Sequence, residues 1–314
     1  MTQSVFIGID VSKARLDVAL GEKGELFSLS HSEQQIPALV EKLKAAFPQL
    51  IIIEASGGLE RYLVASLAEA GLPVVVVNPR QVRDFAKATG KLAKTDAIDA
   101  RVLAEFGVAI KPPQRPLRDS ARQKIADQVS RRRQIVDMLI QEKNRLSRAA
   151  DPVRADIQHH INYLQERLKQ SNEDIEKMIK ESPLYQETVE LLTTVPGVGP
   201  VTTAALVAFC PELGTLNRHQ IAALIGTAPF NRDSGTRRGQ RIVWGGRKLL
   251  RNLLYMATVS AIRCNSKIRT FYSRLIAAGK KFKVAITACM RKLIILLNAM
   301  VKQRQPWREG TVTN

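Results

Sequence analysis

The chain has 314 residues, of which 45% are hydrophobic, and a formal net charge of +19. Its three cysteines, odd in number and far apart, exclude a disulfide framework and a cysteine-rich zinc site, and its four histidines argue against a histidine-based metal site. No apolar run reaches the roughly 18 residues that span a bilayer, and the start of the chain lacks the basic region of a signal peptide. We therefore expect a cytoplasmic protein of about two domains.

The positive charge is concentrated in the second half of the chain. Residues 1–100 hold 11 basic and 12 acidic residues, whereas residues 234–314 hold 18 basic residues and a single acid, Glu309. Such an asymmetry predicts a polyanionic partner. Nucleic acid is favoured over a membrane surface because the sequence shows no clean basic amphipathic anchor and no lipidation motif.

Residues 1–115 have the pattern of an α/β domain. The segments LIIIEA (50–55) and PVVVVN (73–78) are almost entirely apolar, as in strands buried on both faces. The other expected elements are strands at 5–11, 16–21 and 26–31 and helices at 33–47, 59–71 and 79–90. Three strands followed by alternating helices and strands predict a mixed sheet with helices on its faces.

The pattern changes at residues 116–182, which predict a long helical arm. The segments 118–149 and 153–181 are polar and helical, each with an apolar stripe, and Asp151-Pro152 separates them. This is typical of a helical hairpin or coiled-coil arm that spaces or joins protomers. A simple two-helix linker folded onto the rest of the protein is an equally good interpretation.

Residues 183–314 predict an all-α, basic domain. Helices are expected at 243–263 and 280–304, with Arg and Lys on one side. The segment VPGVGPVTTAAL (195–206) has the form of a helix–hairpin–helix element, in which Gly197 and Gly199 let the backbone approach a phosphate at a helix N-terminus. A plain turn between two helices is the alternative.

Four acids of the first domain stand where metal chemistry needs them. Asp10 lies in the first strand, and Glu54 ends the strand 50–55 at an edge where α/β proteins place their sites. Asp96 and Asp99 are spaced i, i+3 at a helix start and share one face. Carboxylates suit Mg²⁺, and two such ions stabilise the attacking and leaving oxygens of phosphodiester chemistry.

Each acid also has a structural interpretation. Asp96 and Asp99 would complement a helix dipole, Asp10 would cap a turn, and Glu54 would pair with a lysine. Two rival acids nearby, Asp17 and Glu60, are expected to be structural. The four acids together, rather than any one of them, predict the metal site.

A second candidate site lies in the basic loop 224–241. Ser234 stands between Asp233 and Gly235, and a serine among arginines can accept a phosphoryl group while the guanidinium groups stabilise the developing charge. A simple Asp-Ser-Gly turn is the alternative. The cations expected to contact nucleic acid in and after this loop are Arg237, Arg238, Arg241, Arg247 and Lys248, with Arg232 also in the loop.

Nearly the whole chain resembles one family. The motifs, in chain order, are GIDVSK, IEASGG, VNPRQVRDFAKATG, KTDAIDARVLAEF, VPGVGPVTTAAL, TAPFNRDSGTRRG and GGRKLLRNLLYMA. They resemble the insertion-sequence 110 family of transposases, which has the Piv/MooV site-specific DNA invertases as relatives.

The resemblance implies a RuvC-like, RNase H-like fold for the first domain, with Asp10, Glu54, Asp96 and Asp99 as a DEDD site for Mg²⁺ or Mn²⁺. It implies that Ser234 is a nucleophile that forms a 5′-phosphoserine link with DNA during strand exchange. Several members of the family are guided by a structured bridge RNA that the element encodes. Family assemblies are tetrameric, and the serine of one protomer can complete the metal site of another.

The predicted function is therefore that of a DNA transposase or site-specific recombinase. Its expected partners are double-stranded DNA, a structured guide RNA and further copies of the chain in a dimer or tetramer, in the bacterial cytoplasm at the nucleoid. A site-specific DNA invertase is one alternative. A RuvC-type structure-selective nuclease needs the acids but not Ser234, and an architectural nucleic-acid-binding protein needs neither.

Overall fold

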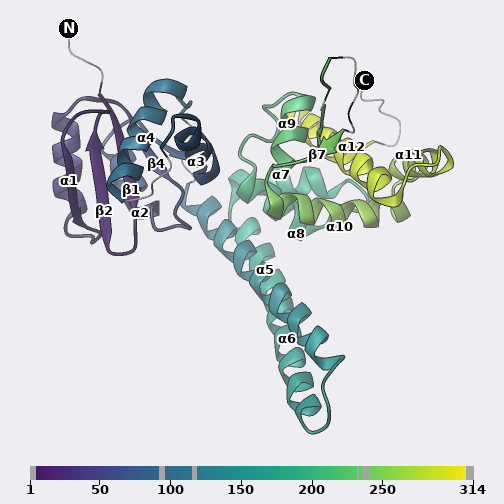
Figure 1. Cartoon of the computed structure of the whole chain (residues 1–314). Coiled ribbons are helices and arrows are strands. Elements are labelled where there is room, and N and C mark those ends of the chain that lie inside the picture. Colours follow the sequence, from purple (N-terminus) through teal and green to yellow (C-terminus); the bar gives the residue numbers. More distant parts are fainter. Residues whose placement is uncertain are drawn as a thin grey trace. The chain divides into compact units, whose positions relative to one another are not determined.

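The computed structural model describes residues 5–91, 96–114, 119–231, 233–235, 239 and 241–308, and it describes only the backbone of Asp96 and Ala97. The chain forms two compact units, Met1–Leu117 and Arg118–Asn314 (Figure 1). Each unit has its own core.

The first unit is built on a five-stranded sheet in the order β3-β2-β1-β4-β5. Its strands are β1 (Val5–Val11), β2 (Arg15–Leu20), β3 (Leu26–Ser30), β4 (Pro48–Glu54) and β5 (Val74–Val77). The strands β1, β2 and β3 form an antiparallel meander, whereas β4 pairs parallel with both β1 and β5. The predicted mixed sheet is confirmed.

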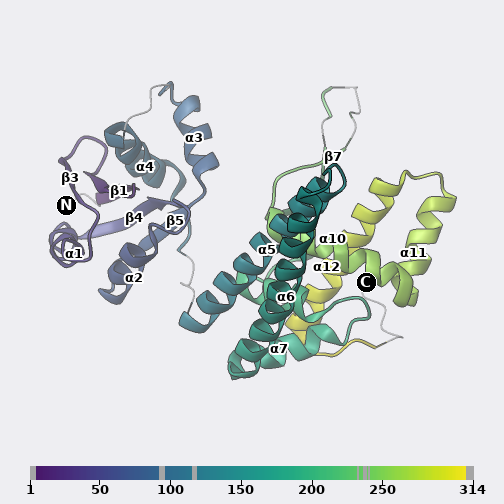
Figure 2. The same ribbon diagram turned by 90° about the horizontal axis from the view of Figure 1, so that it is seen from below.

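Helices cover both faces of this sheet. They are α1 (Ile36–Ala45), α2 (Arg61–Glu69), α3 (Pro79–Ala88) and α4 (Asp96–Ile110). Because side chains alternate along a strand, Ile7 and Ile51 join the core of α1 and α2, while Phe6 and Ile52 join that of α3 and α4. Figure 2 shows α3 and α4 on one side of β4 and α2 on the other. Each fully buried isoleucine contributes about 1.5–3 kcal/mol.

Two glycines allow α4 to lie directly on the sheet. A Cβ added to Gly8 of β1 would stand 2.0 Å from the carbonyl oxygen of Ala100, and one added to Gly107 would stand 2.3 Å from Cδ1 of Ile52 and 3.0 Å from Cδ1 of Phe6. The turn of α4 at Gly107 therefore lies beside Phe6, and the turn at Ala100 lies beside Gly8. It follows that α4 runs antiparallel to β1, with its first turn toward the carboxyl end of that strand.

The second unit begins with two long helices, α5 (Ser120–Leu146) and α6 (Val153–Lys180). The inner halves of α5 and α6 belong to the main core of the unit, whereas the outer halves share a small cluster of Ile135, Leu139, Ile157, Ile161 and Leu164. Their outer ends extend away from the other helices of the unit (Figure 1). The helices α5 and α6 correspond to the two helices expected at 118–149 and 153–181, and the base of the pair is continuous with the rest of the unit.

The remaining elements of the unit are α7 (Pro183–Thr193), α8 (Pro200–Phe209), α9 (Arg218–Ile225), β6 (Pro229–Phe230), β7 (Ile242–Val243), α10 (Lys248–Cys264), α11 (Ser266–Ala277) and α12 (Phe282–Gln303). Among the described residues, α12 alone is long and apolar enough to cross a membrane, but half of its most apolar window is buried inside the protein. Leu293, Ile294 and Leu297 of α12 are fully buried in the main core.

Two sequence-based expectations for this unit are wrong. The unit is not entirely helical, because the β-branched residues of β7 pair antiparallel with β6. The helix expected over 243–263 begins only at Lys248. Gly245 and Gly246, both with φ of +73°, have left-handed backbone conformations that are incompatible with an α-helix, so α10 begins after them.

Candidate active site and nucleic-acid interface

Asp10 and Glu54 occupy neighbouring positions on one face of the sheet. The register pairs Ile9 with Ile53, and the next residue of each parallel strand is an acid. By alternation both acids lie on the face of Gly8 and Ile52, which is the face that α4 covers. Both residues are half-buried at the carboxyl ends of their strands.

Asp96 and Asp99 form the first turn of α4. Because α4 runs antiparallel to β1 and Ala100 lies on Gly8, this first turn faces the sheet edge that carries Asp10. Asp99 is half-buried, and the side chain of Asp96 lies outside the described residues. The backbone therefore brings all four predicted acids to one edge of the first unit.

Among the side chains that the structure describes, no group of three or more His, Cys, Asp or Glu residues is close enough to hold a metal ion. The carboxylate of Asp96 is not among those side chains. The donor set at the edge nevertheless consists of carboxylates alone, which fits a hard divalent cation such as Mg²⁺. The metal site stays a prediction that rests on the placement of the four residues.

The rival acids have structural partners. Asp17 lies opposite Asp10 in the register and is 2% exposed. Its carboxylate accepts hydrogen bonds from Arg15 Nε at 2.9 Å and from Ser28 Oγ at 2.5 Å. Sequence analysis missed Arg15, although its i, i+2 spacing from Asp17 on a strand is a signal that the two side chains share a face.

Glu60 fixes the loop that follows Glu54. Its carboxylate accepts hydrogen bonds from the backbone N–H groups of Ser56 at 3.0 Å and of Gly58 at 2.9 Å. This agrees with the structural role expected for Glu60. The loop is thereby held just beyond the last residue of β4, which supports the position of Glu54.

Ser234 lies in the loop between β6 and β7 and is exposed. The preceding residue, Asp233, accepts a hydrogen bond from the backbone N–H of Gly239 at 3.1 Å, which closes part of the loop. Arg241 is exposed as well. The other predicted cations of the loop lie outside the described residues: Arg232, Arg237 and Arg238.

The glycines of the turn between α7 and α8 differ in their surroundings. Gly197 has a φ of +94°, and an added Cβ would stand 2.5 Å from the backbone N and Cα of Ala261 in α10. Gly197 is therefore required by close packing of two segments, a role that sequence analysis did not foresee. Gly199 precedes α8, is exposed, and has open space where a Cβ would be. Of the two, Gly199 is the one whose surroundings leave room for a phosphate.

Arg247 has a strong partner within the protein. Its guanidinium donates two hydrogen bonds of 2.7 Å to the carboxylate of Glu212 and one of 2.7 Å to the carbonyl oxygen of Phe209. Burial opposes the charge, but Glu212 outweighs burial and raises the pKa of Arg247. Arg247 thus anchors α10 to the segment after α8, while the adjacent Lys248 is exposed. Nucleic-acid contact by these two residues stays a prediction.

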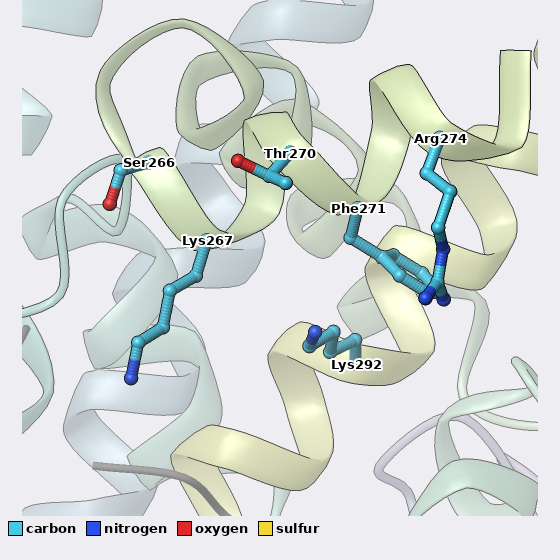
Figure 3. A pocket seen from close by; sticks show the side chains of 6 residues that line it. All are labelled: Ser266, Lys267, Thr270, Phe271, Arg274 and Lys292. Atoms are coloured by element: carbon cyan, nitrogen blue, oxygen red, sulfur yellow. The ribbon is translucent and has the colours of Figure 1, made fainter. Parts of the chain in front are cut away.

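A basic pocket of about 340 Å³ lies between α11 and α12 (Figure 3). Phe271 is its aromatic centre: Lys292 Nζ lies 4.6 Å and the Arg274 guanidinium carbon 5.2 Å from the ring centroid. Lys267 also lines it, with Nζ 5.0 Å from the centroid of Trp307. Neither helix contains an acidic residue. The pocket gathers three cations, which suits an anion such as phosphate.

Two family models match the chain. A transposase model for the DEDD domain of IS110-type elements matches residues 7–153, and the model of the transposase IS116/IS110/IS902 family matches residues 189–273. The first match agrees with an RNase H-like α/β fold for the first unit. The second match includes Gly197, Ser234 and Arg247.

Similar proteins align with the chain from end to end. The pilin gene-inverting protein of Moraxella bovis is 26% identical over 312 residues, which cover 96% of this chain and 97% of that protein. The pilin gene-inverting protein of Moraxella lacunata gives the same values. The 44.8 kDa protein of insertion element IS116 from Streptomyces clavuligerus is 26% identical over 388 residues, with 96% and 95% of the two chains covered. The chain belongs to the IS116/IS110/IS902 family of transposases and is a DNA transposase or recombinase.

Proposed function

We propose that this transposase exchanges DNA strands with Ser234 as its nucleophile and with divalent ions held by Asp10, Glu54, Asp96 and Asp99. The observation that carries the proposal is the meeting of β1, β4 and the first turn of α4 at one sheet edge. Carboxylates at one sheet edge repel one another, and a divalent cation bound there would offset this repulsion.

The reaction is a transesterification. The Oγ of Ser234 attacks the scissile phosphorus, a serine–phosphate ester forms at the 5′ side, and the bond to the 3′ oxygen breaks. The serine proton leaves to solvent or a base, and the departing oxygen gains a proton to become a 3′-hydroxyl. Divalent ions, when bound by the four acids, polarise the phosphate and lower the cost of deprotonating the attacking oxygen. Arginines of the loop, including Arg241, stabilise the charge that develops on the phosphate.

The active site is proposed to be composite. Ser234 belongs to the second unit and the four acids to the first, and we propose that they come together in a complex with DNA. As in the family that the sequence resembles, the serine of one protomer completes the metal site of another. We assign the functional domains as residues 1–115, a coiled-coil arm at 116–182 that joins protomers, and residues 183–314.

The second unit is proposed to bind the DNA backbone. Its exposed phosphate contacts are the helix–hairpin–helix turn at Gly199, the loop cation Arg241, and the pocket of Lys267, Arg274 and Lys292. These contacts do not read sequence. We propose that sequence is read by a structured bridge RNA, which occupies part of the same basic surface; this part of the proposal rests on the family resemblance.

The end-to-end similarity to the pilin gene-inverting proteins supports a second candidate, a site-specific DNA invertase. The two functions share their chemistry and differ in the arrangement of the sites that they join. A plasmid with two recombination sites in inverted orientation distinguishes them, because an invertase flips the intervening segment and a transposase excises or inserts the element.

The test of the nucleophile compares Ser234→Ala with Asp10→Asn. We expect both variants to lose the covalent protein–DNA adduct on denaturing gels and the recombinant product. Glu60→Gln provides a control, because it alters a nearby structural carboxylate and should retain the adduct. An active Ser234→Ala would identify water as the nucleophile and the protein as a RuvC-type nuclease. An active Asp10→Asn would contradict the proposed metal site.

A further inference from the structure

A second pocket follows the serine loop in the chain, and three aromatic residues line it, whereas Phe271 is the one aromatic residue among the described residues that line the basic pocket of Figure 3. It lies where the chain returns from the loop through β7 onto α10, and its volume is about 520 Å³. This falls within the roughly 300–1,000 Å³ of small-ligand sites. Its lining includes Trp244, Tyr255, Phe282, Arg251, Lys283 and Met290. We call it the Trp244 groove.

The aromatic side chains of the Trp244 groove are unusually exposed. The exposed fractions are 59% for Trp244, 51% for Phe282 and 37% for Tyr255. Exposed apolar rings beside one another usually mark a binding surface. The groove also carries the cations Arg251 and Lys283, and residues 234–308 contain no acid.

The backbone on which Trp244 stands is held in place. A Cβ added to Gly246 would lie 2.2 Å from the backbone N of Gly226, so these two segments touch without intervening side chains. Arg251 Nη1 donates to the carbonyl oxygen of Gly245. The backbone N–H of Arg247 donates to the carbonyl of Leu224 at 2.9 Å. Trp244 is thus presented on a fixed segment, which lowers the entropy lost when a ligand binds.

We propose that the Trp244 groove binds an unstacked nucleobase of a single-stranded segment beside the strand that Ser234 cleaves. Aromatic rings with interspersed cations are the features that hold single strands, because every base has a face that stacks. An uncharged protein segment is disfavoured because both charged residues of the lining, Arg251 and Lys283, are positive. The inference rests on the proposed function, since strand exchange separates paired strands next to the cut and leaves their bases unpaired.

The groove can be tested with the protein's own fluorescence. The chain has two tryptophans, Trp244 and Trp307, so Trp307→Phe leaves Trp244 as the single reporter. We expect an oligothymidylate to quench this emission saturably, and an abasic strand of equal length and charge, or a blunt duplex, to quench it much less. Equal quenching by the abasic strand would overturn the proposal, because phosphates alone would then account for binding.

Binding measured by the anisotropy of a labelled oligothymidylate gives an independent readout. Trp244→Ala should weaken binding about fivefold or more, as the loss of one base–aromatic stack requires, and Trp244→Phe should retain most of it. Tyr163→Ala is the matched control, because Tyr163 is an exposed aromatic residue on α6 and should have no effect. Equal weakening by Tyr163→Ala would contradict the assignment.

Two outcomes separate this inference from the proposed function. If the wild-type protein forms the serine adduct but Trp244 does not respond to single strands, the groove assignment fails and the recombinase mechanism stands. If Trp244 responds and Ser234→Ala still recombines DNA, the mechanism fails instead. A Trp244 emission that changes with protein concentration in the absence of DNA would assign the groove to a second copy of the chain and overturn the proposal.

Discussion

Asp17 changes the electrostatic surroundings of Asp10. The two residues face each other across β1 and β2, and a carboxylate at position 17 without a partner would compete with Asp10 for cations. Arg15 instead pairs with Asp17 at 2.9 Å, and Ser28 donates to its other oxygen. The charge of Asp17 is therefore compensated within the protein by Arg15.

The crowding of acids predicts that divalent ions stabilise the first unit. Mn²⁺ or Mg²⁺ should raise the thermal midpoint. At an ion concentration about one hundred times Kd, the free energy of unfolding should increase by about 2.7 kcal/mol. Asp10→Asn and Glu54→Gln should lose most of this response when followed by calorimetry. The control is Asp84→Asn, an exposed carboxylate paired with Arg80 on α3, which should keep it. If divalent ions raise the thermal midpoint of Asp10→Asn as much as that of the wild type, the cation binds at another site.

Arg247 and Lys248 are adjacent cations with different expected roles. Arg247→Ala removes both hydrogen bonds to Glu212 and the one to the carbonyl of Phe209. We therefore expect the free energy of unfolding, measured in urea, to fall by about 2–4 kcal/mol. Lys248→Ala changes an exposed residue and should alter the free energy of unfolding by no more than about 0.5 kcal/mol. Similar effects of the two substitutions would mean that the Glu212 pair contributes little to folding.

The pair of Asp119 and Tyr185 predicts how the stability of the second unit depends on pH. Burial opposes the effect, but hydrogen bonds from Tyr185 and the Arg122 backbone, with the Arg122 charge, lower the pKa of Asp119. Burial and the same hydrogen bond raise the pKa of Tyr185 to about 12. The contribution of Asp119 is therefore lost as pH falls through its lowered pKa, and that of Tyr185 is lost as pH rises through its raised pKa.

Thermal midpoints measured across pH test this pair. Asp119→Asn should flatten the acid side of the profile, because it removes the carboxylate whose protonation destabilises the fold. Tyr185→Phe should flatten the alkaline side. A profile that Asp119→Asn leaves unchanged would show that other carboxylates cause the acid unfolding.

At the scale of elements, the arm has two parts with separate cores. The base of the α5–α6 pair contributes Ile125, Val129, Ile175 and Ile179 to the main core, whereas the outer part has its own cluster around Ile161. Replacing residues 134–169 by a short turn should therefore spare the fold of the unit. We expect this variant to unfold at nearly the wild-type temperature, to lose recombination, and to run as a monomer in light scattering. An unchanged mass would show that other surfaces join the protomers.

The elements that sequence analysis identified best are those with local signals. The apolar runs IIIE and VVVV are strands β4 and β5, and the break at Asp151-Pro152 separates α5 from α6. That Asp10 and Glu54 meet at one edge followed from their predicted places, Asp10 in the first strand and Glu54 at the end of the strand 50–55. The direction of α4 did not, because it depends on Gly8 and Gly107 meeting residues that are distant in sequence.

Long-range contacts also account for what sequence analysis missed. Gly197 was assigned to a phosphate turn, but its contact with Ala261 joins residues 64 apart in number. The pairing of Arg247 with Glu212 and the short β6–β7 hairpin likewise join segments that no periodicity connects. A helix was expected to start at 243 because its amphipathic pattern extends into the glycine turn.

At the scale of the whole molecule, the charge is carried by the second unit, and the basic pocket gives it a specific test. Replacing Lys267, Arg274 and Lys292 by Gln should weaken DNA binding and reduce the slope of log K against log salt by about 0.9 for each phosphate that the protein no longer neutralises. The control replaces three exposed cations outside the pocket: Lys280, Lys302 and Arg304. Equal changes in slope for the two triple variants would mean that only the total charge matters.

The near balance of charge in residues 1–100 bears on when cutting can occur. A first unit whose charges nearly balance has little attraction of its own for the DNA backbone, so random encounters with the chromosome are expected to be made by the second unit. That unit carries the serine but none of the four acids. In the proposed mechanism, a protein that scans the genome brings Ser234 to each phosphate that it passes, and strand breakage waits until an assembled complex adds the four acids. Under this mechanism, the division of charge between the units would limit cleavage while the protein searches for its site.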